Sequence, residues 1–197
     1  MIDYKIERLD KENQRLLDNF SCVENNEKLS CFDAKTRRRI KKHSVEMDTF
    51  LHEEALKEQE KGLSATYLFV NDSQLLAYLS LCNDAILLNF DEKSNMGFSY
   101  ATEPAIKIAR LAVSNTVQGC GLGKEIIEYA VAISQEIREY SGVVFLTLDC
   151  YRHRLSYYSQ FGFVKNEIQH IELPFDSPIS MRLWIDAYLK LIDSENL

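Results

Sequence analysis

Three glycines at alternate positions, Gly119, Gly121 and Gly123, constrain this chain more than any other feature. They lie between the apolar run Ile106–Val113 and the amphipathic stretch Ile126–Tyr140, an order that predicts a strand, a tight turn and the start of a helix. Glycines let the backbone turn its N–H groups toward a ligand without a Cβ in the way, and the helix adds the positive end of its dipole. The turn therefore predicts a phosphate-binding site.

The spacing around these glycines narrows the class of phosphate ligand. A P-loop requires a glycine five residues before its Gly-Lys pair and a serine or threonine after it, but those positions hold Gln118 and Glu125. A dinucleotide-binding fingerprint requires its third glycine at the position of Lys124. These spacings disfavour a nucleotide-dependent kinase and a dehydrogenase.

Two motifs give the turn a family context. Read as Q-x-x-G-x-G, residues 118–123 resemble the pyrophosphate-binding signature of the GCN5-related N-acetyltransferases, the GNAT family. The segment Leu155–Val164, with its Tyr-Tyr-Ser-Gln-Phe-Gly-Phe core, resembles the helix-to-strand segment of the same family. The resemblance extends from about Ala105 to Val164. It implies an α/β (α+β) fold, with a central mixed, twisted sheet of about six to seven strands flanked by helices and a V-shaped splay between the two parallel central strands.

The resemblance also implies where a cosubstrate would bind. Acetyl-CoA is expected, and its pantetheine arm is expected to pair with the backbone of Leu111, Ala112 and Val113. No metal is expected, because the five cysteines are scattered without a C-x-x-C pair or a His-Cys cluster. The pyrophosphate is expected on the turn, held by Gln118, Gly119, Cys120, Gly121, Leu122, Gly123 and Lys124.

Acetyl transfer from a thioester benefits from a proton donor for the departing thiolate, and the resemblance assigns this role to Tyr158. A phenol with an ordinary pKa of about 10 is protonated at neutral pH. Tyr157 is the rival. Adjacent positions on a helix point about 100° apart, so only one of the two tyrosines is expected to face the cleft.

The general base is predicted less specifically. Glu103, before the cofactor strand, and Asp149, near the end of the following strand, are the candidates for a proton relay through water, with Glu103 preferred. Either carboxylate could instead be solvated or cap a helix. His153 fits an exposed polar role better than a catalytic one. Tyr151 stands where many family members have an asparagine, so a pantetheine contact from that position is in doubt.

The expected activity is transfer of an acetyl group from acetyl-CoA to a primary amine, by direct attack in a ternary complex. A small-molecule amine or a protein or peptide amine is expected as the acceptor. The layout also resembles toxins that acetylate aminoacyl-tRNA, but the formal net charge of −7 places that acceptor lower. One local exception is a basic cluster, or alternatively a solvated helix face, made of Arg37, Arg38, Arg39, Lys41, Lys42 and His43.

A non-catalytic module that holds acyl-CoA as a sensor is the alternative from a different class, because a phosphate turn predicts binding but not turnover. A homodimer is a further option. The sequence leaves open the acceptor, the acyl length and the presence of an antitoxin partner.

Length and composition favour one domain over residues 1–197, with 46% hydrophobic residues. No apolar run approaches the roughly 18 residues that would span a bilayer, and the N-terminus lacks a signal-peptide core, so a cytoplasmic protein without a membrane partner is expected. The chain divides into a mainly helical part (1–63), a cofactor-binding core (64–164) and C-terminal strands (165–197).

Periodicity and turn signals predict the individual elements. The polar stretch Asp91–Thr102 is expected to be an exposed loop. A β-α-β unit around the glycine turn predicts two adjacent parallel strands. Helices are predicted over residues 11–20, 45–61, 122–140 and 152–160, and strands over 3–9, 65–70, 75–82, 105–113, 143–150, 163–173 and 179–185.

Overall fold

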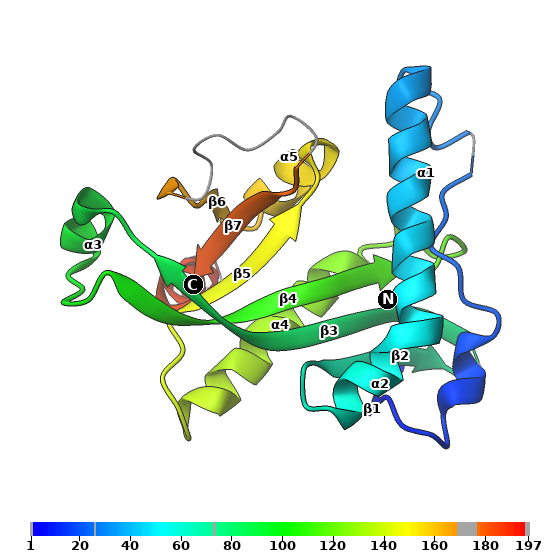
Figure 1. Cartoon of the computed structure of the whole chain (residues 1–197), viewed down its shortest axis with the longest axis horizontal. Coiled ribbons are helices and arrows are strands. Elements are labelled where there is room, and N and C mark those ends of the chain that lie inside the picture. Colours follow the sequence, from blue (N-terminus) through cyan, green and yellow to red (C-terminus); the bar gives the residue numbers. More distant parts are fainter. Residues whose placement is uncertain (1, 26, 73, 169–176, 196–197) are drawn as a thin grey trace. The chain divides into compact units, whose positions relative to one another are not determined.

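The computed structural model describes residues 2–25, 27–72, 74–168 and 177–195 (Figure 1). The elements, in chain order, are β1 (Lys5–Arg8), η1 (Gln14–Leu17), α1 (Ala34–Thr49), η2 (Phe50–Glu54), α2 (Ala55–Glu60), β2 (Ala65–Asn71), β3 (Gln74–Leu87), α3 (Phe90–Met96), β4 (Thr102–Val113), α4 (Leu122–Arg138), β5 (Phe145–Cys150), η3 (Arg152–Arg154), α5 (Leu155–Ser159), β6 (Val164–Lys165), β7 (Ile179–Trp184) and α6 (Ile185–Glu195).

The described strands form one mixed seven-stranded sheet in the order β1-β2-β3-β4-β5-β7-β6. Strands β4 and β5 are parallel, with Ala105 paired to Phe145 and Ile108 to Leu148. Strand β7 pairs antiparallel with β5 and with β6. The predicted mixed sheet with two adjacent parallel strands, connected through the helix after the glycine turn, is therefore confirmed, whereas the splay between these strands stays a prediction.

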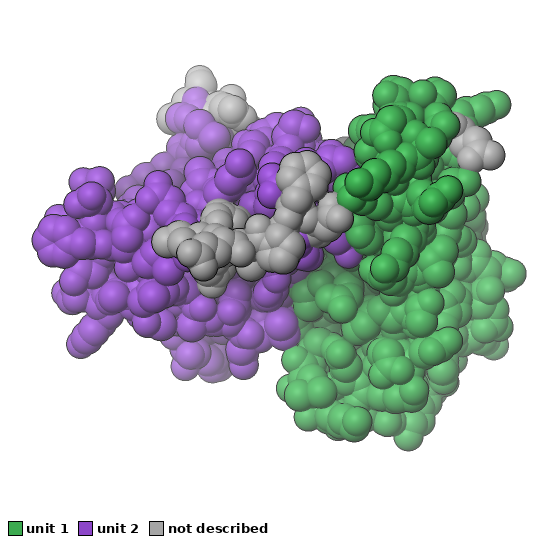
Figure 2. Space-filling view, turned by 45° about the horizontal axis from the view of Figure 1, so that its top comes forward, with its two compact units in different colours: residues 1–81, 109–128 green, residues 82–108, 129–197 purple. Residues whose placement is uncertain are grey.

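The chain divides into two compact units, which Figure 2 colours green and purple. Unit 1 contains residues 1–81 and 109–128, and unit 2 contains residues 82–108 and 129–197. The glycine turn belongs to unit 1, and Tyr158 belongs to unit 2. The prediction of a single domain stays a prediction.

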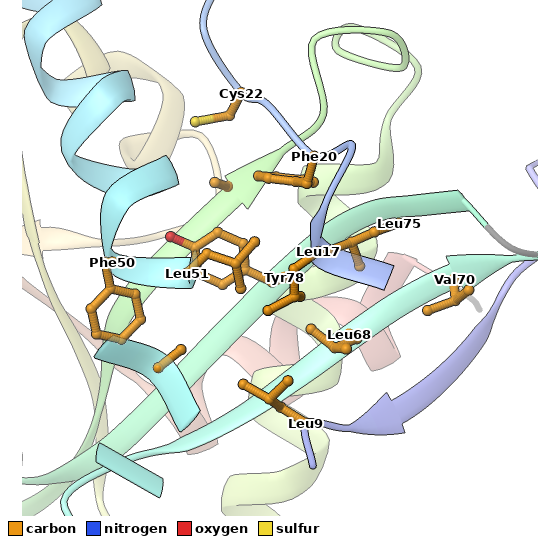
Figure 3. Close-up of a cluster of buried hydrophobic side chains, with 12 residues drawn as sticks. Leu9, Leu17, Phe20, Cys22, Phe50, Leu51, Leu68, Val70, Leu75 and Tyr78 are labelled. Atoms are coloured by element: carbon orange, nitrogen blue, oxygen red, sulfur yellow. The ribbon is translucent and has the colours of Figure 1, made fainter. Parts of the chain in front are cut away.

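The core of unit 1 is built around Tyr78 on β3 (Figure 3). Its ring lies 5.6 Å from that of Phe20 and 6.3 Å from that of Phe50, and its hydroxyl donates to the carbonyl of Met47 at 2.8 Å. A buried tyrosine hydroxyl needs such a partner, since an unpaired polar group in the core costs free energy. The cluster packs η1 and the helices α1 and η2 against the sheet.

Unit 2 contains a buried ion pair between Arg182 on β7 and Glu92 on α3. Arg182 is 4% exposed, and its Nη2 donates to Oε1 of Glu92 at 2.5 Å. Its Nη1 donates to Oδ1 of the buried Asn166 at 2.9 Å. A desolvated guanidinium requires partners of this kind, so the pair fixes α3 against the end of the sheet.

Helix α3 corrects the prediction of an exposed loop over Asp91–Thr102. Asn89 and Glu92 form a capping box, in which the Asn89 side chain accepts from the Glu92 N–H and the Glu92 side chain accepts from the Asn89 N–H. Gly97 ends the helix in the left-handed region, with φ 73°. The helix is short and its two apolar residues, Phe90 and Met96, stand at its two ends, so hydrophobic periodicity gives no signal.

Helix α1 begins eleven residues before the predicted start at Val45. Asp33 caps it by accepting hydrogen bonds from the N–H groups of Lys35 and Thr36 at 2.9 and 3.0 Å. Ile40 is the residue of α1 that is buried, so the basic stretch carries little apolar pattern. A π-helical turn, η2, then joins α1 to α2, and Gly62 follows the end of the helix with φ 70°.

Three further predictions differ from the structure. The stretch Lys11–Phe20 contains only the short 3-10 helix η1, because the Asp10 side chain accepts from the N–H groups of Glu12 and Asn13 and forms a turn. The strand predicted over 163–173 is limited to β6 among the described residues, and residues 169–173 lie outside them. Residues 185–195, expected among C-terminal strands, form α6 with Ile185 and Tyr188 buried. No helix of the described residues is long and apolar enough to cross a membrane.

Candidate functional site

The glycine turn connects β4 to α4 with left-handed backbone at two positions. Gly119 has φ 91° and Gly121 has φ 90°, a region that residues with a Cβ rarely adopt. An added Cβ at either glycine would meet nothing within 4 Å. Backbone conformation, rather than crowding within the protein, therefore requires glycine at both positions. Gly123 lies in the first turn of α4 and does not have a positive φ.

Four backbone N–H groups of the turn have no acceptor among the described residues: those of Gly119, Gly121, Leu122 and Gly123. Three of them belong to the start of α4, where the first N–H groups of a helix lack an intrahelical partner. Gly119 and Gly121 are exposed. This set of N–H groups, together with the helix dipole, fits an anion such as a pyrophosphate.

The side chain of Gln118 anchors the turn to two other segments of unit 1. Its Nε2 donates to the carbonyl of Val113 at 3.0 Å and to the carbonyl of Cys22 at 2.9 Å. Its Oε1 is buried and has no hydrogen-bond donor among the described residues. The side chain thus joins the end of β4 to the N-terminal part of the chain, and only the backbone of Gln118 remains for a ligand.

A second set of contacts reaches the turn from residues 21–28, excluding residue 26. The Asn115 N–H donates to the Ser21 carbonyl at 2.8 Å, and Asn115 Nδ2 donates to the Val23 carbonyl at 3.2 Å. Lys28 Nζ lies 3.4 Å from the carbonyls of Asn115 and Gln118. Sequence reasoning missed this segment, and no local signal marks it, because the contacts join residues about 90 positions apart.

Charged side chains on the first turns of α4 are already paired. Lys124 Nζ lies 3.5 Å from Glu128 Oε1, with both side chains largely exposed. Glu125 accepts a hydrogen bond of 2.7 Å from the hydroxyl of Tyr4. Cys120 is an exposed thiol on the turn, and Leu122 is buried and anchors the start of the helix.

The predicted pantetheine residues Leu111, Ala112 and Val113 form the last three positions of β4. Ala112 is buried in the core cluster of unit 1, and its neighbours are half-buried. These residues therefore lead directly into the turn, and the prediction that their backbone binds the cofactor stays a prediction.

Tyr158 lies on α5 in a group of aromatic rings. Its ring is 5.2 Å from that of Tyr157 and 5.8 Å from that of Phe163. Burial, with smaller contributions from Tyr157 and Cys150, raises the pKa of Tyr158 above its ordinary value, and Arg154 opposes this shift. Among the described residues no group accepts a hydrogen bond from the Tyr158 hydroxyl. A neutral phenol can serve as a proton donor.

The pKa of Tyr157 is also raised by burial, and its ring packs 5.1 Å from that of Phe161. His153 stacks on Tyr151 at 6.1 Å with an interplanar angle of 5°. The structure thus places Tyr151, His153, Tyr157 and Tyr158 in one short region after β5.

The structure does not bring Glu103 to this region. Glu103 is buried at the start of β4, two residues before the pairing of Ala105 with Phe145, whereas Tyr151 and α5 follow the other end of β5. At about 3.3 Å per residue, Glu103 lies roughly 20 Å along the strands from the level of Cys150. A catalytic role for Glu103 stays a prediction.

Asp149, the other candidate base, is paired. Its Oδ2 lies 2.6 Å from Nζ of Lys107 on β4. Burial lowers the pKa of Lys107, but the hydrogen bond and charge of Asp149, with Asp84, outweigh burial and raise it overall. Thr147 donates to Asp84 at 2.6 Å, so these groups form a polar network on unit 2. Among the described residues no cluster of three or more His, Cys, Asp or Glu side chains is placed to hold a metal ion.

Comparisons with known proteins give this geometry a context. A model of the acetyltransferase (GNAT) family matches residues 30–163, which is more than half of the chain. The match includes the glycine turn and the segment carrying Tyr158.

Several solved structures share the fold. A tyrosine-to-phenylalanine mutant of KacT gives a TM-score of 0.72 at 15% identity, covering 96% of this chain and 99% of that one. AtaT complexed with acetyl-methionyl-tRNAfMet gives 0.71 at 16% identity, with 96% and 99% covered. AtaTR bound with AcCoA gives 0.67 at 17% identity, with 98% and 99% covered. At these identities the likeness shows the fold alone.

Proposed function

Because this chain belongs to the acetyltransferase (GNAT) family, we propose that it transfers an acetyl group from acetyl-CoA to a primary amine. The observation that carries the proposal is a set of four N–H groups at the start of α4 that have no acceptor in the part of the chain that the structure describes: those of Gly119, Gly121, Leu122 and Gly123. Acetyl-CoA supplies an activated acetyl thioester and the pyrophosphate that fits this turn.

Each part of the chain has a role in this proposal. The N–H groups of the turn bind the pyrophosphate, and the backbone of Leu111, Ala112 and Val113 pairs with the pantetheine arm. The amine nitrogen forms the new C–N bond while the C–S bond breaks and leaves its electron pair on sulfur. Tyr158 donates its phenolic proton to that sulfur, and the amine proton leaves to solvent.

For the acceptor, we propose an amine carried on aminoacyl-tRNA. The first nine residues of α1 contain six cations and no acid. At physiological salt, charges act over about 8 Å, so this local density counts for more than the net charge of the whole chain. AtaT, which shares the fold, has been solved with acetyl-methionyl-tRNAfMet. A small-molecule or protein amine is the competing acceptor.

Calorimetric titration with acetyl-CoA tests the cofactor part of the proposal. We expect saturable binding and a rise in the melting temperature, because a ligand that binds only the native state stabilises it by mass action. ATP and NAD serve as controls. Neither should bind measurably, and neither should raise the melting temperature. Absence of binding at millimolar acetyl-CoA would contradict the proposal.

An acceptor comparison tests the rest. Purified protein and acetyl-CoA are incubated with methionyl-tRNA, uncharged tRNA, methionine amide or a peptide with a free N-terminus, and acetylated products are measured by mass spectrometry. We expect acetylation of methionyl-tRNA, and Arg38→Glu should lower its kcat/KM without changing acetyl-CoA affinity. Acetylation of only the small amines or the peptide overturns the tRNA acceptor, and tight cofactor binding without any turnover supports a sensor.

A further inference from the structure

Lys28 lies behind the glycine turn in a position that the chain fixes at several points. The Lys28 N–H donates to Oδ1 of Asn25 at 2.9 Å, and the next residue, Leu29, is buried at 2% exposure. The backbone of Lys28 is therefore held by a turn on one side and by the core on the other. Its ammonium group reaches the carbonyls of Asn115 and Gln118, both at 3.4 Å.

The carbonyl of Gln118 belongs to the same peptide unit as the N–H of Gly119. A trans peptide is planar, and its C=O and N–H point in opposite directions. A cation that holds the Gln118 carbonyl on one side therefore directs the Gly119 N–H to the other side, where we propose that the pyrophosphate binds. An ammonium at the oxygen also polarises the peptide and strengthens its N–H as a donor.

The charge of Lys28 has no carboxylate partner among the described residues. Lys124, the lysine within the turn motif, is paired with Glu128 instead. Glu125 and Glu128 add two negative charges on the same helix end. Without Lys28, the turn would face a pyrophosphate with one paired lysine and two carboxylates nearby.

We propose that Lys28 is a positioning residue for the cofactor phosphates: it holds the carbonyl side of the turn so that the Gly119 N–H faces the ligand, and it supplies the uncompensated positive charge behind the turn. The proposal rests on the use of acetyl-CoA proposed above. It adds a residue from the N-terminal part of the chain to a site otherwise formed by residues 111–124.

The test measures CoA affinity by calorimetry for the wild type, Lys28→Met and Lys28→Arg, at 50 mM and 500 mM salt. Lys28→Met should weaken binding about tenfold at low salt and less at high salt, since screening removes most of a charge effect over several ångströms. Lys28→Arg should restore most of the affinity. Lys61→Met, which removes another exposed lysine of unit 1, should change affinity less than twofold.

Dephospho-CoA, which lacks the 3′-phosphate, identifies the phosphate involved. A positioning role at the pyrophosphate predicts the same loss for CoA and dephospho-CoA in Lys28→Met. A loss seen only with CoA overturns the proposal, because it would assign Lys28 to the 3′-phosphate. If the wild type binds CoA and Lys28→Met binds it with the same affinity, the proposal for Lys28 is also overturned, but the proposed function is not. A wild type that binds no CoA overturns both.

Discussion

The hydroxyl of Tyr4 donates a 2.7 Å hydrogen bond to Oε2 of Glu125, a residue of the first turn of α4 that lies 121 positions away in the chain. Partial burial, followed by the hydrogen bond and the charge of Glu125, raises the pKa of Tyr4 to about 12. The Tyr4 ring also packs 5.4 Å from that of Phe69 on β2. This bond ties the N-terminal residues to the helix that begins at the phosphate turn.

The Tyr4–Glu125 bond predicts a change of stability at alkaline pH. Because the pKa of Tyr4 is higher in the folded state than in the unfolded state, its contribution is complete below about pH 10 and is lost as pH rises toward 12. After allowance for solvent screening, the loss is on the order of 1 kcal/mol. Urea denaturation at pH 9 and pH 11.5 should show a smaller loss for Tyr4→Phe than for the wild type. Tyr100→Phe, an exposed control, should follow the wild type.

The Glu92–Arg182 pair predicts a large loss of stability in unit 2. Glu92→Ala leaves the Arg182 guanidinium buried without its counter-charge, which typically costs about 3–5 kcal/mol. It also removes one half of the capping box of α3, worth about 1 kcal/mol. Asn89→Ala removes the other half, together with an exposed hydrogen bond of 2.7 Å from Asn89 Nδ2 to Glu167, and serves as the matched control. Equal losses in the two variants, measured by urea denaturation, would show that the ion pair contributes little.

Gly121 has a positive φ and Gly123 does not, so alanine should affect the stability of the protein differently at these two positions. Gly121→Ala forces a left-handed residue and should cost about 1–2 kcal/mol of stability. Gly123→Ala is placed in helical backbone and should cost nothing through its conformation. Thermal unfolding without ligand measures both. If Gly121 also shapes the phosphate site, Gly121→Ala should weaken acetyl-CoA binding more than tenfold, and unchanged affinity in the folded variant would place the cofactor elsewhere.

Tyr158→Phe should lower kcat by roughly 10² to 10⁴, the usual contribution of general acid catalysis, with little change in acetyl-CoA affinity. The ring and its packing remain, so the fold should not change. Tyr157→Phe is the neighbouring control and should lose much less activity. Steady-state kinetics with whichever acceptor supports turnover decides this point, and a fully active Tyr158→Phe would return that tyrosine to a packing role.

The β4-α4-β5 unit could be predicted from the sequence because two signals agree. The segments that form β4 and β5 are rich in aliphatic residues, although Lys107 and Asp149 interrupt them, and the stretch after Gly123 has helical spacing. Helix α3 and the first part of α1 could not be predicted in this way. Their ends are set by side-chain caps at Asn89 and Asp33, and their surfaces are too polar to show an apolar period.

The candidate site shows the same division. The glycines of the turn could be predicted from the sequence because a left-handed backbone favours glycine, which the local sequence shows directly. No local pattern predicts the roles of Lys28 and Tyr4, since their contacts with Gln118 and Glu125 span 90 and 121 positions. The sequence alone does not show that Asp149 is paired, because its partner Lys107 lies on the neighbouring strand. Contacts of this kind depend on the register of the whole sheet rather than on any motif.

The helical stretch from α1 through η2 to α2 should tolerate the loss of one residue within the π-helical turn η2 better than within α1. A π turn accommodates one more residue than an α turn, so the flanking α1 and α2 keep their apolar faces aligned across it. Removing one residue from η2, such as the exposed Glu53, would let the turn relax to α-helix with Ile40 and Ala55 still facing the core. Removing one from α1, such as Lys42, would rotate everything before it by about 100° and expose Ile40. Natural variants of this protein that differ by a single insertion or deletion should therefore concentrate their length change within residues 50–54.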